Sequence, residues 1–235
     1  LGGAGNWNDP YLTMAYSSEA ATVKEFLKVA MSGQLKRGAK PVMWSPVEQT
    51  ALAEAEIEYA DRKATMIWVK FPVKTGGVGD ASVVIWTTTP WTLPANEAVS
   101  AHPEFTYDLL DTPKGLLILV HDLAEFAIQR YGFEGATLLG QAQGAALEKL
   151  ALQHPFYDKQ VPLICGLHVT VESGTGLVHT APAHGLEDYQ VGLHYQLPVN
   201  NPVGPDGKFL SNTPQFAEQL IWDANKTVVE TLEAN

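Results

Sequence analysis

The spacing of apolar residues predicts one helix near the start of the chain. Residues 1–16 are predicted to form a loop that leads into this helix. Ser17 or Ser18 can then cap the helix, and Gly33 can end it. One face of this helix is apolar and consists of Val23, Phe26, Leu27, Ala30 and Met31. The pattern therefore predicts an amphipathic helix before residue 33.

Short apolar runs interrupted by Pro, Gly and Asp predict strands from there to about residue 120. These strands are expected at 42–44, 51–59, 66–73, 83–87, 105–110 and 116–120. Apolar and polar residues alternate over 53–59, which is typical of a strand with one face in solvent. Residues 74–80 include three glycines and are predicted to form a hairpin loop.

The second half of the chain mixes helices and strands without a regular alternation. A short amphipathic helix is expected at 121–131, and later helices at 185–195 and 216–232. Strands are expected at 137–139, 149–153, 161–165 and 176–180. This order argues against a doubly wound parallel sheet, and we predict a mixed α+β fold with a β-barrel-like core and peripheral helices.

Composition and charge narrow the class of protein. The 235 residues are 46% hydrophobic and 17% charged, which is enough for a sizeable core and excludes a disordered, collagenous or coiled-coil chain. Cys165 is the only cysteine, so the chain has no internal disulfide framework. No stretch resembles a membrane span or a secretory signal. Because the chain starts at Leu1, it is expected to be a piece of a longer protein.

The net charge of −11 lies entirely in residues 81–235, because residues 1–80 hold nine basic and nine acidic side chains. A protein that grips nucleic acid by itself usually carries a basic stripe. The negative net charge therefore argues against a protein that binds nucleic acid by itself.

Residues 86–96, the threonine segment, read Trp-Thr-Thr-Thr-Pro-Trp-Thr-Leu-Pro-Ala-Asn and follow an apolar strand. Thr87, Thr88 and Thr89 offer hydroxyls that both donate and accept hydrogen bonds, and the two prolines stiffen the loop. An ordinary β-branched strand end followed by a proline turn would have the same composition. The threonine segment alone leaves both interpretations open.

Residues 174–189, the histidine segment, combine a glycine-rich start, a strand, a proline turn and a helix that begins near Gly185. His179 then lies near the strand end and Asp188 in the first helical turn. The simple structural alternatives are a buried, hydrogen-bonded histidine and an aspartate favoured by the helix dipole. A metal site from His179, His184 and Asp188 is a third alternative, but its spacings match no common zinc signature.

Together the two segments resemble the signatures of the editing domain of isoleucyl-tRNA synthetases, an insertion in the class I synthetases for branched aliphatic amino acids. The resemblance covers nearly the whole chain and extends to 8–14, 51–56 and 201–204. Related valyl and leucyl enzymes carry Thr-Thr-Arg-Pro where this chain has Thr89 before Pro90 and Trp91. The resemblance implies one editing domain over 1–235, with 1–16 and about 216–235 as connecting ends.

The resemblance implies hydrolysis of the ester that joins valine wrongly to tRNA(Ile), with exclusion of the isoleucyl ester. One missing methylene in a hydrophobic pocket gives only about 1–3 kcal/mol of discrimination, a limit for which isoleucyl-tRNA synthetase is the standard example. A second site would hold the α-ammonium group, cradle the terminal adenosine and place a water on the ester carbonyl. The alternatives are a non-catalytic module that binds the tRNA 3′ end and a metal-dependent hydrolase.

Three sets of side chains would perform the reaction by this resemblance. Asp188 would bind the ammonium group, because a carboxylate accepts a charge-assisted hydrogen bond. His179 would wall the valine pocket, although a general-base role is chemically possible. Thr87, Thr88 and Thr89 would line the floor, with hydroxyls near the ester and the attacking water.

Other residues would surround the substrate in the same scheme. They are Asn96, Trp86, Trp91, Gly174, Gly176 and His184. The asparagine would fix the terminal ribose or the loop, and the tryptophans would stack on adenine or pack in the core. The two glycines would permit close approach of the backbone.

No metal or cofactor is expected for editing. ATP, and zinc if it is used, would belong to the parent enzyme outside this chain. The implied partners are the 3′ end of tRNA(Ile) carrying valine and the remainder of the synthetase, in a cytoplasmic monomer without a membrane. Many relatives carry a Cys-x-x-Cys pair just after the tryptophan that corresponds to Trp44. Ser45 and Glu48 occupy those positions, which excludes a zinc knuckle there and leaves packing alone to hold the region.

Overall fold

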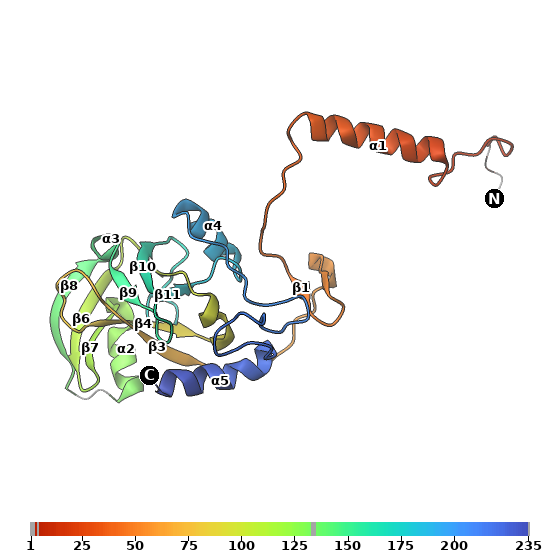
Figure 1. Cartoon of the computed structure of the whole chain (residues 1–235). Helices are drawn as coiled ribbons and strands as arrows, with labels where there is room; N and C mark the ends of the chain where they lie inside the picture. Colours follow the sequence, from red (N-terminus) through yellow and green to blue (C-terminus); the bar gives the residue numbers. More distant parts are fainter. Residues whose placement is uncertain (1–2, 4, 133–134, 235) are drawn as a thin grey trace. The chain divides into compact units, whose positions relative to one another are not determined.

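The computed structural model describes residues 3, 5–132 and 135–234, and the chain separates into two compact units, Leu1–Ala39 and Lys40–Asn235. The first unit contains helix α1 (Tyr16–Met31), none of whose residues is buried (Figure 1). The predicted helix is confirmed: it ends at Met31, and Gly33, two residues later, has the left-handed φ of +78° that stops it. The predicted serine cap is wrong, because the helix begins after Ala15 and the serines lie inside its first turn.

The larger sheet of the second unit has five strands. Their spatial order is β3 (Ile67–Pro72), β4 (Ser82–Thr87), β7 (Gly115–Val120), β6 (Thr106–Thr112) and β8 (Thr137–Gln143). β3 and β4 are antiparallel around the predicted loop at 74–80, whereas β4 and β7 run parallel. β4 therefore lies inside the sheet and carries the threonine segment at its end.

A second sheet has four strands. Their order is β11 (Leu177–Thr180), β5 (Ala98–Ala101), β10 (Gln160–Cys165) and β9 (Ala151–Gln153). An isolated bridge between Val73 and Leu152 joins this sheet to the larger one. The described strands form no closed barrel. The barrel-like core is therefore two joined sheets, in the mixed α+β fold that the sequence predicts.

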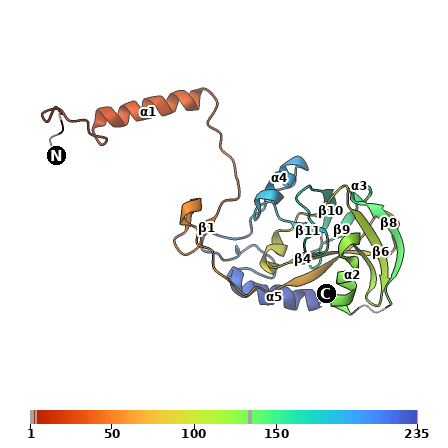
Figure 2. The same cartoon turned by 180° about the vertical axis from the view of Figure 1, so that it is seen from behind.

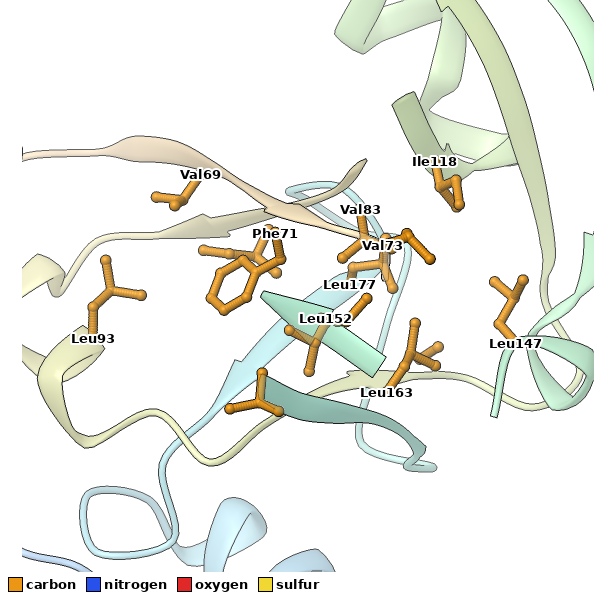
Figure 3. Close-up of a cluster of buried hydrophobic side chains, with 14 of the residues drawn as sticks. Val69, Phe71, Val73, Val83, Leu93, Ile118, Leu147, Leu152, Leu163 and Leu177 are labelled. Carbon is orange, nitrogen blue, oxygen red and sulfur yellow. The ribbon is translucent and has the colours of Figure 1, made fainter. Parts of the chain in front are cut away.

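The main core lies between the two sheets (Figure 3). Phe71 and Val83 from the larger sheet pack in one cluster with Leu152, Leu163 and Leu177 from the smaller sheet, and each is almost completely buried. Several of these positions lie in short runs of mostly apolar residues, as in β4 and β10, because both faces of those strands are largely buried. Such apolar runs are the pattern from which the strands were predicted.

The helices cover the edges of this core. They are α2 (His121–Tyr131), α3 (Gly144–Leu147), α4 (Leu186–His194) and α5 (Ile221–Ala234), with the 3₁₀ helix η2 (Pro90–Ala95). A second 3₁₀ helix, η1 (Glu54–Glu56), has only exposed residues and does not cover the core. α5 packs along η2, as both Figure 1 and the reverse view in Figure 2 show. Its Ala224 and Val228 are completely buried. None of the described helices is long and apolar enough to cross a membrane.

The predicted strand at 51–59 is wrong over most of its length. Only β2 (Thr50–Ala51) pairs, with β1 (Trp44–Ser45), and η1 follows. The alternating residues are mostly Ala and Glu, which offer little apolar surface for a sheet face to bury. In addition, the Glu56 carboxylate accepts a hydrogen bond from the Ala53 amide at 2.7 Å and closes the 3₁₀ turn.

Candidate functional site

The two motif segments meet across strand β5, which the sequence analysis missed. β5 follows the threonine segment directly and pairs antiparallel with β11, with His179 opposite Val99 and Thr180 opposite Ala98. The Glu97 amide donates to the Thr180 carbonyl at 2.9 Å at the start of this pairing. The pairing therefore brings the predicted threonines and His179 into one region.

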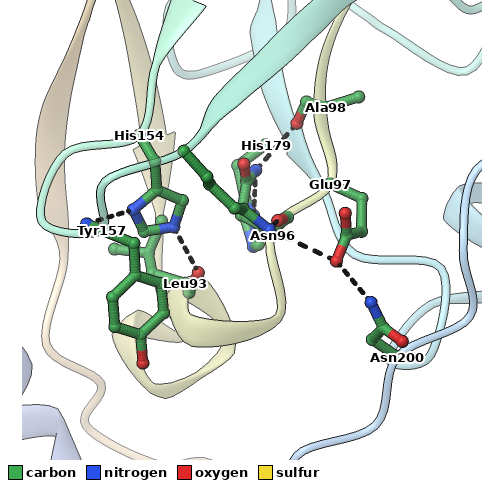
Figure 4. Close-up of polar contacts among 9 residues, drawn as sticks. Leu93, Asn96, Glu97, Ala98, His154, Tyr157, His179 and Asn200 are labelled. Atoms are coloured by element: carbon green, nitrogen blue, oxygen red, sulfur yellow. Dashed lines mark hydrogen bonds and ion pairs between the residues drawn. The ribbon is translucent and has the colours of Figure 1, made fainter. Parts of the chain in front are cut away.

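His179 is held by hydrogen bonds at both ring nitrogens. Its Nε2 lies 2.8 Å from Thr92 Oγ1, and its Nδ1 lies 3.2 Å from Asn96 Nδ2 (Figure 4 shows the asparagine contact). Thr92 Oγ1 also lies 2.8 Å from the Thr89 carbonyl, to which only its own hydroxyl hydrogen can donate. Nε2 of His179 therefore carries the proton and donates to Thr92, while Nδ1 accepts from Asn96.

His179 is neutral in this environment. Its side chain is buried, and burial lowers its pKa to about 3, with smaller contributions from the nearby His184 and His154. Because Nδ1 already accepts a hydrogen bond, no lone pair is available for proton abstraction. The geometry suits a rigid wall better than a general base.

Asn96 holds the end of the threonine segment. The residue is completely buried, and its Nδ2 donates to the Ala98 carbonyl at 2.8 Å as well as to His179 (Figure 4). Lys159 Nζ donates to the Asn96 carbonyl at 2.5 Å and forms an ion pair with Glu97 at 3.3 Å. Of the two roles expected for Asn96, this geometry matches the one of fixing the loop.

The three predicted threonines face different surroundings. Thr87 is buried, and its Oγ1 accepts a hydrogen bond from the Thr89 amide at 3.1 Å and lies 3.3 Å from Thr89 Oγ1. Thr88 and Thr89 instead line an open cavity of about 590 Å³, together with Trp91. Thr87 thus supports the loop, whereas Thr88 and Thr89 are accessible to a ligand.

Asp188 lies in the first turn of α4, and its Oδ2 accepts a hydrogen bond from the Ala181 amide at 2.8 Å. Its other oxygen makes no hydrogen bond or ion pair within the described part of the chain. Burial raises the pKa of Asp188 to about 6; the Ala181 amide opposes this shift and Glu187 adds to it. A half-buried carboxylate without a cation is a favourable site for an ammonium group.

Trp86 and Gly174 lie together at a second cavity. This cavity has about 390 Å³ and is also lined by Trp68 and Arg130. Gly174 has a φ of +85°, and a Cβ added there would approach Trp86 Cε3 to 3.2 Å. Successive strand residues point to opposite faces, so Trp86 faces away from Thr87. The structure therefore does not bring Trp86 and Gly174 to the cavity that Thr88 and Thr89 line.

Gly176 and His184 each pack closely against one neighbouring side chain. A Cβ on Gly176 would lie 2.3 Å from Val120 Cβ, so glycine is needed there for close packing. The His184 and Trp91 rings make an edge-to-face contact with centroids 5.1 Å apart beside a cavity of about 150 Å³. Burial lowers the pKa of His184 to about 4, and its buried Nε2 has no hydrogen-bond partner among the described residues.

Two residues that hold this site together were not predicted from the sequence. Thr92 connects His179 to Thr89, and Asn225 of α5 accepts a hydrogen bond from the Trp91 amide at 3.1 Å. The position of Thr92 three residues after Thr89, in one helical turn, was the available signal. Asn225 lies far away in the sequence and gave no local signal.

The geometry does not favour a metal site. In the described ranges, no group of three or more His, Cys, Asp or Glu side chains is placed to hold a metal ion. His179 also has both nitrogens engaged.

The region after Trp44 is held by more than packing, which corrects the expectation from the missing cysteine pair. The Ser45 hydroxyl hydrogen-bonds to the Glu48 carboxylate, and Trp44 Nε1 donates to the Pro205 carbonyl at 2.9 Å.

Comparisons of sequence place the chain among aminoacyl-tRNA synthetases. The family model for tRNA synthetases class I (I, L, M and V) matches residues 1–222. The chain is 51% identical to an isoleucine–tRNA ligase of Dechloromonas aromatica and 53% identical to one of Chromobacterium violaceum. Each alignment covers 100% of this chain but 27% and 26% of the respective relative, so the chain spans about a quarter of their length.

Solved structures match at the level of the fold. The crystal structure of GlLeuRS-CP1 has a TM-score of 0.59 and 14% identity, over 73% of this chain and 96% of that one. The editing domain of the P. knowlesi cytosolic leucyl-tRNA synthetase has a TM-score of 0.57 and 10% identity, over 75% and 96%. The predicted editing-domain fold is therefore confirmed.

Proposed function

The chain belongs to the class I tRNA synthetases for isoleucine, leucine, methionine and valine, and from this premise we propose that it is the editing domain of an isoleucyl-tRNA synthetase. In this proposal it hydrolyses the ester of valine wrongly joined to tRNA(Ile) and excludes the isoleucyl ester. Its homology to isoleucine–tRNA ligases and its editing-domain fold support the assignment. The tRNA and the rest of the synthetase are the partners.

The proposal depends most on the carboxylate of Asp188, which forms no ion pair with the residues that the structure describes. An aminoacyl ester presents an α-ammonium group, which is the cation that this half-buried carboxylate lacks. Asp188 is held at Ala181, two residues beyond His179, so the ammonium group would lie near the end of β11. Binding the cation would also favour the ionised form of a carboxylate whose pKa burial raises to about 6.

His179 acts as the size limit of the valine pocket in this scheme. A wall that rejects one methylene must not move, and the hydrogen bonds to Thr92 and Asn96 fix both edges of the ring. The neutral state matters as well, because a charged imidazolium would repel the substrate ammonium.

The hydrolysis itself depends on positioning rather than on a protein base. Thr88 and Thr89 would orient the ester and the attacking water from the floor of the open cavity, and a ribose hydroxyl would assist. The reaction uses no metal and no nucleotide cofactor, and a chelator is expected to leave its rate unchanged.

The test is deacylation of valyl-tRNA(Ile) by the full-length synthetase that carries this chain. Asp188→Ala is expected to remove most of this activity and to leave isoleucylation unchanged. Turnover close to wild type, in a variant that still charges tRNA(Ile), would contradict the proposed role. A wild-type enzyme that binds the tRNA end but does not deacylate it would support the non-catalytic alternative instead.

A further inference from the structure

Lys159 lies outside the residues that the proposed reaction uses, in the loop between β9 and β10. Its main chain is held on both sides. Its amide donates to the Tyr157 carbonyl at 2.8 Å, and its carbonyl accepts from the His154 amide at 3.0 Å and from Gln153 Nε2 at 3.1 Å. The side chain therefore extends from a fixed backbone, and only 33% of it is exposed.

The Lys159 ammonium group contacts two successive residues, Asn96 at the end of the threonine segment and Glu97 after it. Its Nζ donates to the Asn96 carbonyl at 2.5 Å and lies 3.3 Å from a carboxylate oxygen of Glu97. That oxygen also accepts a hydrogen bond from Asn200 Nδ2 at 3.0 Å (Figure 4). Because only 13% of the Glu97 side chain is exposed, solvent and salt screen this ion pair less than a surface pair.

Helix η2 has an incomplete set of its own hydrogen bonds at this end. Pro94 lies inside η2 and has no amide hydrogen, so one hydrogen bond of the 3₁₀ turn is missing. Asn96 is the residue at which η2 ends, and its amide donates to the Leu93 carbonyl at 3.0 Å. A charged donor forms a stronger hydrogen bond to a carbonyl than a neutral donor does. Lys159 therefore fixes the main chain between the end of η2 and the start of β5.

The position of Asn96 determines one of the two hydrogen bonds that hold His179. Asn96 Nδ2 lies 3.2 Å from His179 Nδ1, near the upper limit for a hydrogen bond. Asn96 Oδ1 is buried and has no hydrogen-bond partner among the described residues. The side-chain amide is therefore oriented by Nδ2 alone, through His179 and the Ala98 carbonyl. A small displacement of the Asn96 main chain is enough to break the contact with His179.

From these contacts we propose that Lys159 is a positioning residue for the rejection of the isoleucyl ester. Its ammonium group holds the Asn96 carbonyl, Asn96 holds Nδ1 of His179, and His179 limits the size of the amino acid side chain. Lys159 is not among the described residues that line the open cavity beside Thr88 and Thr89, so it acts through Asn96 rather than by contact with the ester. This inference rests on the proposed function for the identity of the ester.

The test measures the ratio of kcat/KM for valyl-tRNA(Ile) to kcat/KM for isoleucyl-tRNA(Ile) in the full-length synthetase. Lys159→Met keeps the aliphatic stem but removes the ammonium group. It is expected to lower the ratio about 3–10-fold, less than a whole charged hydrogen bond is worth, because the other hydrogen bonds of Asn96 and His179 remain. Lys159→Arg keeps a cationic donor and is expected to restore most of the ratio.

A second variant separates the bond to the carbonyl from the ion pair. Lys159→Met alone leaves Glu97 without its cation, which lowers stability by itself. Lys159→Met/Glu97→Gln removes both charges, keeps an oxygen for Asn200, and is expected to lower the ratio as much as Lys159→Met does. Tyr195→Phe is the matched control, because it removes a hydroxyl that makes two hydrogen bonds elsewhere in the same unit and should leave the ratio unchanged.

A third comparison shows whether Lys159 acts through His179. In His179→Ala the size limit is already absent, so adding Lys159→Met should lower the ratio no further. An equal loss in the wild-type and His179→Ala backgrounds would show that the two residues act independently, and it would overturn the inference.

A structure of the Lys159→Met synthetase tests the same link without a measurement of deacylation. We expect the Asn96 carbonyl to move and the hydrogen bond between Asn96 and His179 to be lost. Unchanged positions of Asn96 and His179 would overturn the inference whether or not the wild type deacylates valyl-tRNA, and so would a wild-type ratio in the folded variant. A wild type without deacylation, together with a displaced Asn96 in the variant, would reject the proposed function and keep Lys159 as the residue that positions His179.

Discussion

Two buried histidines, His154 and His179, contact η2 on different sides. On one side His154 donates from Nε2 to the Leu93 carbonyl at 3.1 Å and accepts at Nδ1 from the Tyr157 amide at 3.0 Å (Figure 4). On the other side His179 donates to Thr92 and accepts from Asn96. Burial lowers the pKa of His154 to about 4 and that of His179 to about 3.

The surroundings of the two rings differ more than their protonation does. His154 stacks on Tyr157 with ring centroids 4.9 Å apart and meets Phe156 edge-on at 4.6 Å, so it completes an aromatic core. The partners of His179 are side chains of the threonine segment, which opens to solvent at Thr89. Burial and a low pKa therefore do not distinguish the two histidines, whereas the connection of His179 to accessible polar groups does.

Truncation of His179 is expected to have the largest effect of the substitutions around η2. In the full-length synthetase, His179→Ala should enlarge the valine pocket and raise hydrolysis of correctly charged isoleucyl-tRNA(Ile) by about 10–200-fold, the range that one methylene is worth. Rates of deacylation for both esters measure the change. A variant that ignores isoleucyl-tRNA as firmly as the wild type would remove the size-limit role.

Asp188→Asn removes the negative charge of this carboxylate while preserving the shape of the side chain. Its amide oxygen can still accept from Ala181, but it cannot attract the ammonium group. We expect kcat/KM for valyl-tRNA to fall about 10–150-fold, the range for a charged hydrogen bond, while the melting temperature at pH 7–8 is equal or higher. A large loss of stability would show that the carboxylate is structural.

His154→Ala is the matched control for His179→Ala. It leaves buried groups around Leu93 and Tyr157 without partners and should lower the free energy of unfolding by about 2–4 kcal/mol. The ratio of valyl to isoleucyl deacylation should stay at the wild-type value under conditions where the variant is folded. A changed ratio would mean that both sides of η2 define the pocket.

Thr92→Val tests the link between His179 and the threonine segment. The substitution removes the hydroxyl that accepts from Nε2 and should lower the free energy of unfolding by about 1–3 kcal/mol, because a buried N–H loses its partner. We also expect partial loss of discrimination against isoleucyl-tRNA, smaller than in His179→Ala. Full discrimination by a destabilised Thr92→Val enzyme would contradict the positioning role.

The pH dependence separates Asp188 from both histidines. The pKa of Asp188 is raised to about 6, so kcat/KM for deacylation should fall as pH drops through about 6, and the histidines with pKa values of about 3 and 4 should not contribute there. Folded Asp188 keeps its proton to a higher pH than the ordinary 3.8, so its contribution to stability is lost as pH rises from about 4 to 6. Asp188→Asn should lack both effects.

Local patterns predicted the regular elements of this fold well. The helix at 121–131 and the hairpin around 74–80 match the structure because each has a clear apolar face and clear ends. β5 was missed because its sequence, Ala-Val-Ser-Ala, contains little bulk, although pairing with two neighbours buries all four residues. Whether such a sequence forms a strand depends on the neighbouring strands with which it pairs in the folded protein rather than on its own side chains.

The motif residues could be named from the sequence, but their arrangement could not. Thr87 faces inward and supports the loop, whereas Thr88 and Thr89 line the cavity. Trp86 and Gly174 share a different cavity, which only the register of β4 reveals. The domain limits predicted for the editing domain and its connecting ends remain predictions, although α5 within 216–235 packs against η2.

A structure of the full-length synthetase with a non-hydrolysable valyl-adenosine analogue would show which residues contact the ammonium group, the valine side chain and the ester. We predict that the ammonium group lies within hydrogen-bond distance of Asp188, the valine side chain contacts His179, and the ester lies beside Thr88 or Thr89. An analogue that occupies the cavity of Trp86 and Gly174, or that leaves Asp188 without a cation, would contradict the proposed editing site.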